Sequence, residues 1–308
     1  MNFDRALEFY LKYLQTELGY SLLTVKEYKS DLKLFSRYLR QKKNLKDPQP
    51  LSVSSIDKFD LGDFLADLIL ERNNDPKTRN RKLFALRSFF LFLVRQEVLS
   101  DDPTRAFRSS KIRTSAEPIY LRLPQARVYM DTISRSGLKT AIRDLAIMKL
   151  FLYCGLRLSE LVNLDLKDLQ LTDEPSIKVI GKGNKERRVP LHGEVATTLK
   201  EYLPWRNELK PKGNDANALF LSLRKRRINP RTIQVMVKKY AKKSGLDNAG
   251  EITPHKLRHT FASLLYKETK DLRVLQELLG HSSVSTTQIY THTDPEQRRK
   301  TVDQMPKL

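Results

Sequence analysis

Along residues 1–98, apolar side chains recur at intervals of three and four, the period of an α-helix buried along one face. The first run stops at Gly19 and consists of Phe3, Leu7, Leu11, Leu14 and Leu18. The second run consists of Val25, Tyr28, Leu32, Phe35 and Leu39. A third run, over residues 55–70, has as its expected core positions Ile56, Phe59, Leu65 and Ile69. A fourth opens at Pro76 and is expected to bury Leu83, Leu86, Phe90 and Leu93. The pattern predicts a four-helix bundle.

Residues 99–118 differ from the bundle, because the helical pattern ends at Ser100-Asp101-Asp102-Pro103 and no apolar periodicity follows. The basic residues on this segment are Arg105, Arg108, Lys111 and Arg113. This composition predicts a basic linker that lies along DNA, with a disordered surface loop as the alternative.

Residues 119–308 show mostly helical spacing with one interruption. Residues 176–180 and 185–191 have the composition of two strands, and the glycines of Gly181-Lys182-Gly183-Asn184 indicate a tight turn between them. Helical spacing resumes at Asn229. We therefore predict a mainly α protein with a small antiparallel β-sheet, in which a helical bundle precedes a mixed α+β domain.

The charge and composition of the chain restrict the range of functions that it could have. Lys and Arg total 57 against 36 Asp and Glu, a formal net charge of +21. Such an excess favours a nucleic-acid partner through counterion release, with a merely soluble basic protein as the alternative. The single cysteine, Cys154, excludes a disulfide framework and fits a reducing cytoplasm. The start lacks the apolar core of a signal peptide, and the most apolar segment, 145–156, is too short to span a bilayer. We expect a cytoplasmic protein without a membrane anchor.

Arg157 is the first candidate for binding an anion. Gly155 is expected to end the apolar helix 145–153, which puts Arg157 near the start of the next helix. The partial positive charge of a helix N-terminus there would add to that of the guanidinium, and the two could bind a phosphate oxygen. Glu160 is expected to hold the guanidinium in place. Taken alone, the segment fits an ordinary surface ion pair better.

A second cationic pair follows Thr253-Pro254, which has the signature of a helix start and places His255 and Arg258 on one face. A guanidinium can hold two phosphate oxygens, and an imidazole beside it can move a proton. Taken alone, a solvated surface pair is the commoner explanation. His255 and His259 also have the spacing of two zinc ligands, but Lys256 and Arg258 put cations beside such a metal and no glutamate lies between the histidines. We therefore predict no metal site.

The remaining candidates lie in the hairpin and near the C-terminus. Lys182 lies at the hairpin tip, where an ammonium on a glycine turn could give a proton to a leaving oxygen. His281 follows Gly280, the expected stop of helix 271–279, and Tyr290 lies two turns into the helix expected next. A lone tyrosine on a helix is usually a core or interface residue. A phenol of pKa about 10 is also protonated at neutral pH, but surrounding cations would lower the free-energy cost of removing its proton. The candidate catalytic residues are Arg157, Lys182, His255, Arg258, His281 and Tyr290.

Four motifs in order resemble the tyrosine recombinase family, most nearly its Xer-type site-specific recombinases. They are GLRLSE at 155–160, GKGNKER at 181–187, HKLRHTFA at 255–262 and LLGHSSVSTTQIY at 278–290. The resemblance covers nearly the whole chain. It implies a core-binding helical domain over residues 1–98, a linker over 99–118, and a catalytic domain over 119–308, which together form a clamp around DNA.

The resemblance also implies a mechanism. Arg157 and Arg258 would hold the nonbridging oxygens of the scissile phosphate, with His255 and His281 assisting. Tyr290 would attack the phosphorus to form a 3′-phosphotyrosine, while Lys182 protonates the 5′ oxygen that leaves. No cofactor or metal is implied, because the covalent intermediate retains the energy of the phosphoester bond.

The partners implied by the resemblance are double-stranded DNA and further recombinase subunits. The family acts as a tetramer on two DNA sites and passes through a Holliday junction, so we expect a homotetramer or a heterotetramer with a related recombinase. Residues 296–308 would dock into a neighbouring subunit, with a frayed tail as the alternative. The expected role is resolution of chromosome dimers, and a phage or mobile-element integrase would share the chemistry.

Three other functions compete with this hypothesis. A type IB topoisomerase has the same cations and tyrosine, but the short segment after Tyr290 favours a recombinase. A DNA-binding regulator without catalysis is disfavoured, because all six candidate positions carry competent residues. A metal-dependent integrase would need a cluster of acidic ligands, and none stands out in the basic catalytic half.

Overall fold

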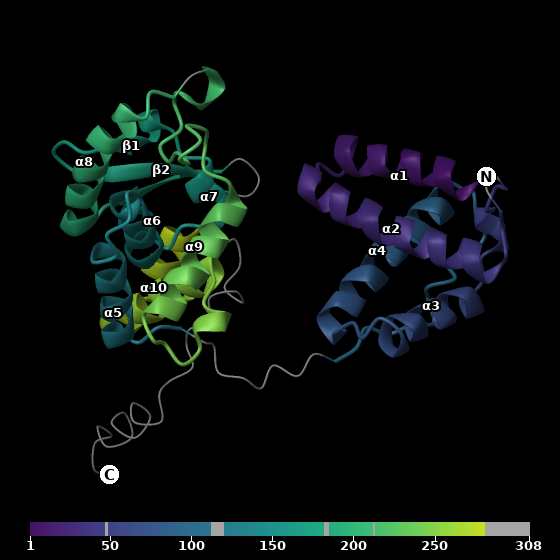
Figure 1. Ribbon diagram of the computed structural model, residues 1–308. Helices are drawn as coiled ribbons and strands as arrows, with labels where there is room; N and C mark the ends of the chain where they lie inside the picture. Colours follow the sequence, from purple (N-terminus) through teal and green to yellow (C-terminus); the bar gives the residue numbers. More distant parts are fainter. Residues whose placement is uncertain (47–48, 112–119, 182–184, 212, 281–308) are drawn as a thin grey trace, which may run out of the picture. The chain divides into compact units, whose positions relative to one another are not determined.

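The structure is a computed structural model, and it describes residues 1–46, 49–111, 120–181, 185–211 and 213–280. The chain divides into two compact units, unit 1 with residues 1–115 and unit 2 with residues 116–308 (Figure 1). Both are mainly helical, and unit 2 also contains a small antiparallel sheet. This architecture confirms the predicted fold class. Among the described helices, none combines the length and apolar character that a membrane span needs.

In its described residues, unit 1 is a bundle of the helices α1 (Phe3–Thr16), α2 (Leu22–Lys42), α3 (Lys58–Leu70) and α4 (Pro76–Arg95), with a short 3-10 turn, η1 (Val53–Ser55). Each α-helix begins after a side chain that accepts hydrogen bonds from first-turn amides, namely Asn2, Ser21, Asp57 and Asp75. α4 packs against the other three helices. The fully buried rings of the core belong to Phe3, Tyr10, Phe35, Phe64, Phe89 and Phe90. The predicted bundle is confirmed.

The third helix differs from its prediction in start and register. α3 begins at Lys58, behind the capping residue Asp57, and not at residue 55. Phe59 and Ile69, both predicted to be core, are 68% and 44% exposed, whereas Ile56 is buried as predicted. The buried apolar residues of α3 are Leu61, Phe64 and Leu68. The prediction for Phe59 and Ile69 was wrong because two overlapping apolar stripes run along this helix, and spacing alone does not tell which one faces the bundle.

The segment after α4 is attached to unit 1 at two points. Asn80 on α4 exchanges two hydrogen bonds with the backbone of Ser110, each 2.8 Å long. Arg87 donates to the carbonyl of Phe107, whose ring lies against Gly62. The described part of the predicted linker is therefore fixed to the bundle, while residues 112–119 lie outside the described residues. Its role along DNA stays a prediction.

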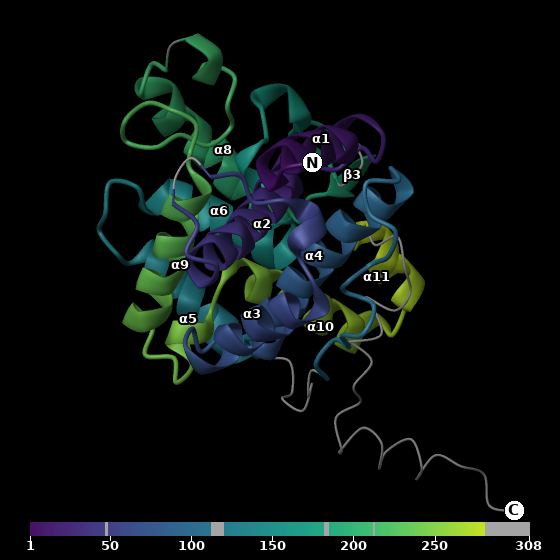
Figure 2. The same ribbon diagram turned by 90° about the vertical axis from the view of Figure 1, so that its right-hand side faces the viewer.

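Unit 2 is built around α6 (Ala141–Cys154), which packs against α5 (Leu123–Ser134), α8 (Gly193–Glu208) and α10 (Pro254–Thr269). The other α-helices described are α7 (Leu158–Val162), α9 (Pro230–Lys243) and α11 (Leu272–Leu279), and the 3-10 turns are η2 (Leu166–Asp168), η4 (Gly213–Asp215) and η5 (Ala249–Glu251). α11 lies beside α10 (Figure 2). Cys154, at the end of α6, is fully buried, and burial raises the pKa of its thiol to about 12. α6 thus packs at the centre of unit 2, and its C-terminal end lies beside the candidate site.

The sheet has three antiparallel strands in the described residues, β1 (Leu169–Gln170), β2 (Ser176–Ile180) and β3 (Glu186–Pro190), in the order β1-β2-β3. In the β2–β3 pair, Ile177 lies opposite Val189 and Val179 opposite Arg187. Ile177, Val179 and Val189 are buried. The predicted hairpin strands are confirmed, the short β1 was not predicted, and the turn residues 182–184 lie outside the described residues.

Gly155 ends α6 in a conformation that favours glycine and in a space with no room for a Cβ. Its φ is 59°, in the left-handed region, and an added Cβ would lie 2.3 Å from Cδ1 of the buried Phe261. The two penalties of left-handed backbone and overpacking predict that Gly155→Ala lowers the free energy of unfolding by roughly 2–4 kcal/mol. Urea denaturation of the two proteins measures this difference.

Gly193 provides the matched control, because it opens α8 and an added Cβ there would meet no atom within 4 Å beyond its chain neighbours and the backbone of its own helix. Gly193→Ala is expected to change stability by less than about 0.5 kcal/mol. Phe261→Leu in the Gly155→Ala background should recover part of the loss by making room. Equal effects of the two glycine substitutions would refute the packing argument.

Candidate active site

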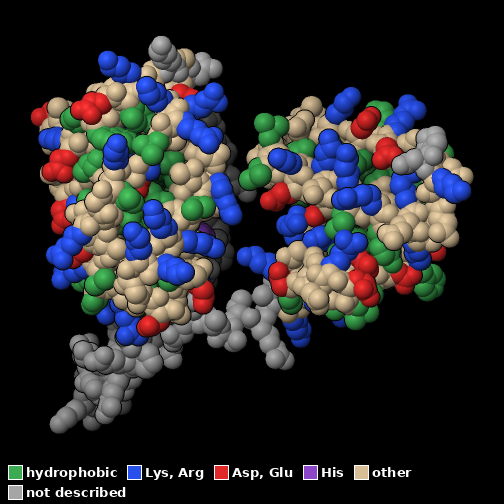
Figure 3. Space-filling view, in the orientation of Figure 1, with side chains coloured by type: hydrophobic (Ala, Val, Ile, Leu, Met, Phe, Trp, Pro, Cys, Tyr) green, Lys and Arg blue, Asp and Glu red, His purple; other side chains and the backbone are tan. Residues whose placement is uncertain are grey.

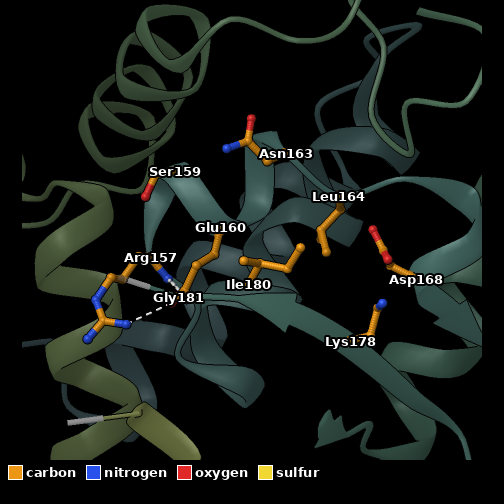
Figure 4. Close-up of a pocket in the computed structure, with 9 residues that line it drawn as sticks. All are labelled: Arg157, Ser159, Glu160, Asn163, Leu164, Asp168, Lys178, Ile180 and Gly181. Carbon is orange, nitrogen blue, oxygen red and sulfur yellow. Dashed lines mark hydrogen bonds and ion pairs between the residues drawn. The ribbon is translucent and has the colours of Figure 1, made fainter. Parts of the chain in front are cut away.

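A buried carboxylate, Glu160, lies at the centre of the candidate site. Its side chain is 2% exposed, and it projects from the first turn of α7. The backbone N–H of Arg157 donates to Oε2 at 2.7 Å, and Nη1 of Arg157 donates to Oε1 at 2.7 Å (Figure 4). The first contact is half of a capping box, which explains why a glutamate three residues after the helix start is locked in place. The predicted Arg157–Glu160 pair is confirmed, although the carboxylate is buried and not on the surface.

Arg187 binds the same carboxylate from strand β3. Its Nη1 donates to Oε1 at 2.8 Å and its Nη2 to Oε2 at 2.9 Å, a two-pronged pair. The sequence prediction assigned no role to this arginine. Strand alternation carries a signal that could have found it, because Arg187 shares its face with the buried Val189, whereas Arg188 between them is exposed.

Arg258 reaches the cluster from the first turns of α10. This helix starts as predicted, with Thr253 as its cap and Pro254 at its first position. Nη1 of Arg258 donates to the carbonyl of Gly155 at 2.6 Å and lies 3.8 Å from Oε2 of Glu160. The side chain is 4% exposed, whereas that of Arg157 is 34% exposed. Three guanidinium groups therefore surround one carboxylate, and Arg157 is the most accessible of them to an incoming anion.

The same three arginines bind the C-terminal end of α11. Nε of Arg187 donates to the carbonyl of Leu278 at 3.0 Å, and Nη2 of Arg258 to that of Leu279 at 2.7 Å. Nη2 of Arg157 donates to the carbonyl of Gly280 at 3.3 Å. The last carbonyls of a helix lack partners within it and carry partial negative charge, which makes them good acceptors for cations. Three successive carbonyls thus fix the point at which the chain continues into His281.

The neighbours of Glu160 change its pKa strongly. Burial alone would raise the pKa, but the hydrogen bonds from Arg187 and from the backbone of Arg157 outweigh it and lower the pKa from 4.5 to about 2. Because the folded value lies below the unfolded one, the ionised carboxylate stabilises the fold above about pH 4.5, by about 3 kcal/mol, and loses this effect as the pH falls toward 2.

Glu160→Gln is therefore expected to be less stable than the wild type by about 3 kcal/mol at pH 7, with the difference shrinking to about half by pH 3. Urea denaturation of both proteins across this range measures it. Glu186→Gln is the control, because this exposed carboxylate pairs only loosely with Lys178, at 3.4 Å, and should show almost no effect. A difference that stays constant with pH would contradict the assigned pKa.

His255 contacts His259 one turn along α10. Their Nε2 atoms are 3.0 Å apart and the rings are nearly perpendicular, at 89°. This distance is that of a hydrogen bond in which one imidazole donates and the other accepts. His255 is exposed and lies one turn before Arg258 on the same helix. In the described part of the chain, no three metal-ligating side chains of the His, Cys, Asp or Glu type come together.

Three of the six predicted residues, Arg157, His255 and Arg258, are described, and the two arginines meet at Glu160. Lys182, His281 and Tyr290 lie outside the described residues. The residues directly before Lys182 and His281, namely Gly181 and Gly280, are described. Gly181 lines a pocket together with Arg157 and Glu160, and the carbonyl of Gly280 accepts a hydrogen bond from Arg157.

The pocket beside Arg157 is a cavity of about 380 Å³ between α7 and strand β2 (Figure 4). Its lining is mixed, with Ser159, Asn163 and Lys178 beside Asp168 and Ile180. Beyond the pocket, the faces of both units seen in Figure 3 carry Lys and Arg side chains widely, and Asp and Glu are fewer. The mixed lining of the pocket does not suit a small apolar ligand, and the many Lys and Arg side chains on the faces in Figure 3 favour a polyanionic partner.

Comparison with known proteins identifies the family. Residues 120–297 match the phage integrase family, and residues 7–97 match the phage integrase N-terminal SAM-like domain. The tyrosine recombinase XerC of Caldanaerobacter subterraneus subsp. tengcongensis is 39% identical to this chain over an alignment 322 residues long. The alignment covers 99% of this chain and 88% of the relative. The chain belongs to the tyrosine recombinase family. The resemblance predicted from the motifs and the predicted class of enzyme are confirmed.

Another relative and two solved structures agree with this family assignment. The XerC of Thermodesulfovibrio yellowstonii is 40% identical over 288 residues, 92% of this chain and 90% of the relative. The XerH site-specific recombinase bound to difH substrate, in a pre-cleavage complex, matches with a TM-score of 0.72 and 26% identity, over 97% of this chain and 83% of that one. A lambda integrase dimer bound to a core site shares the fold, with a TM-score of 0.70 at 21% identity, over 93% of this chain and 97% of that one.

Proposed function

We propose that this recombinase cuts and rejoins DNA at a specific site through a 3′-phosphotyrosine on Tyr290, and that its role is the resolution of chromosome dimers. The phenol oxygen of Tyr290 attacks the phosphorus, the bond from phosphorus to the 5′ oxygen breaks, and a 5′-hydroxyl leaves. The 5′-hydroxyl of a second strand then attacks the phosphotyrosine and releases Tyr290. The number of phosphoester bonds is unchanged, so the cycle needs no ATP.

In this proposal Arg157 and Arg258 bind the nonbridging oxygens of the scissile phosphate, and their charge stabilises the negative charge of the transition state. His255 and His281 donate hydrogen bonds to the same oxygens. Lys182 protonates the leaving 5′ oxygen, which would otherwise depart as a poor, strongly basic leaving group.

The observation that supports this assignment most directly is the meeting of Arg157 and Arg258, which are far apart in the sequence. Both pair with Glu160, at 2.7 and 3.8 Å, and both bind carbonyls at the end of α11. Two guanidinium groups beside the start of the segment that carries His281 and Tyr290 are the arrangement that phosphoryl transfer to a tyrosine needs.

The proposed partners are double-stranded DNA and further recombinase subunits. The net charge of +21 favours DNA, and the similar XerH structure holds its difH substrate. We propose a tetramer on two DNA sites, with identical subunits or with a related recombinase, that passes through a Holliday junction.

Trapping of the covalent intermediate tests the proposed function. The protein is incubated in EDTA with duplexes of candidate sites that carry a nick next to the scissile phosphate, so that the short released strand diffuses away. We expect a protein–DNA adduct that survives denaturation and leaves the protein on a 3′ end. Absence of an adduct on every site, or an adduct on a 5′ end, would sink the mechanism. Relaxation of supercoiled plasmid that lacks a site would instead indicate a topoisomerase.

A further inference from the structure

Arg187 connects the centre of the candidate site to the end of α11, yet it has no role in binding the phosphate under the proposed function. Its side chain is 14% exposed. Two of its nitrogens bind the two oxygens of Glu160, at 2.8 and 2.9 Å, and the third binds the carbonyl of Leu278 at 3.0 Å. All three nitrogens of one guanidinium thus take part in joining strand β3 to α7 and to α11.

The contact with α11 is closely packed. Gly280 ends this helix with a φ of 62°, and an added Cβ there would lie 3.2 Å from Nη1 and 3.3 Å from Cδ of Arg187. A side chain at this position would push on the guanidinium. The helix end and Arg187 therefore fit against each other with little freedom to shift.

Arg187 also shares the carboxylate of Glu160 with Arg157. Nη1 of Arg187 and Nη1 of Arg157 share Oε1 of the carboxylate, at 2.8 and 2.7 Å. Loss of Arg187 would remove its neutralising charge from Glu160, and the carboxylate would then attract Arg157 more strongly. Because Glu160 and a phosphate compete for the same guanidinium, this change disfavours binding of the transition state.

We propose that Arg187 is a positioning residue for strand cleavage. It fixes Glu160 between Arg157 and Arg258, and it docks the end of α11 from which the chain leads to His281 and Tyr290. This inference rests on the proposed function of those residues. A displacement of about 1 Å in a reacting group costs about a hundredfold in rate, so a docking contact of this kind is worth that much to cleavage.

The test compares Arg187→Gln with Arg188→Gln, which removes the same charge from the next residue of β3. Arg188 is exposed and binds Gln170 and Ser176, at 2.9 and 3.1 Å, and not the site. Single-turnover cleavage of a nicked duplex is measured at saturating protein, and DNA affinity by gel shift. We expect Arg187→Gln to cleave about a hundredfold more slowly than the wild type, with a DNA affinity equal to that of Arg188→Gln. Arg188→Gln should cleave at nearly the wild-type rate.

Arg187→Lys covers the case in which Arg187→Gln does not fold. It retains the charge, but an ammonium cannot span both oxygens of Glu160 and the carbonyl of Leu278. We expect this variant to bind DNA normally and to remain slow in cleavage. Cleavage by Arg187→Lys at the wild-type rate would show that charge alone suffices and would overturn the positioning role.

A substrate with a 5′-thiol leaving group separates the role of Arg187 from that of Lys182, which precedes it by five residues in the sequence. A thiol leaves without needing a proton, so this substrate should rescue Lys182→Ala. It should not rescue Arg187→Gln, because this variant is expected to misplace Arg157, Arg258 and the end of α11 and does not lack a proton donor. Rescue of both variants would show that Arg187 merely supports the hairpin, and the inference would be wrong. If the wild type forms no adduct, it is the proposed function that fails, whereas an adduct with a fast Arg187→Gln refutes only the role of Arg187.

Discussion

Tyr290→Phe is expected to bind its DNA site as the wild type does and to form no covalent adduct. Phenylalanine keeps the aromatic ring but lacks the oxygen that bonds to phosphorus in the proposed mechanism, so the loss should be complete and not a reduction in rate. The measurement is denaturing electrophoresis of a labelled nicked duplex after incubation in EDTA, with gel shift to measure binding.

Tyr266→Phe is the matched control, because Tyr266 also lies in unit 2 but on α10, where Lys270 stacks on its ring. It should give the wild-type amount of adduct. An adduct that persists in Tyr290→Phe would assign the nucleophile to another residue, which peptide mass analysis of the adduct would then identify.

Arg258→Gln should slow cleavage by about a hundred- to a thousandfold, the usual cost of losing one group that stabilises transition-state charge. The effect should appear at saturating DNA, because the guanidinium acts on the transition state more than on the bound duplex. Arg258 also binds the carbonyls of Gly155 and Leu279, so the variant should lose stability as well, and unfolding by urea must accompany the kinetics.

Arg143→Gln separates these two effects. The side chain of Arg143 is about as buried as that of Arg258, at 6% against 4% exposed, but it pairs with Asp144 away from the site. Its replacement should reduce stability without slowing cleavage by the molecules that remain folded. If both variants lose cleavage in proportion to their loss of stability, Arg258 is a structural residue and its proposed role falls.

Local sequence signals predicted the helix ends around the site well. Thr253-Pro254 starts α10, and Gly155 and Gly280 stop α6 and α11, as predicted. These signals work because a capping side chain or a left-handed glycine satisfies the backbone at a helix end whatever the rest of the fold does. The position of Arg157 and Arg258 on their helices followed from these ends.

Features that depend on tertiary contacts could not be predicted from local sequence signals. Nothing in the sequence around Arg187 says that a helix end from residue 278 onward will lie against it, and alternation alone separates it from Arg188. Phe59 and Ile69 were placed in the core because the spacing of α3 fits two faces, and only packing against α2 and α4 selects one. The burial of Glu160 likewise depends on elements that meet only in the folded chain.

The buried thiol of Cys154 has a practical consequence for labelling the protein at chosen positions. It is the single cysteine of the chain, and its raised pKa and full burial make it slow to react with thiol reagents. A cysteine introduced at the exposed Leu22 of unit 1, and another at Leu223 of unit 2, could therefore be labelled with fluorophores without first removing a native one. Energy transfer between the two dyes, measured with and without DNA, would then report whether the distance between these two positions changes.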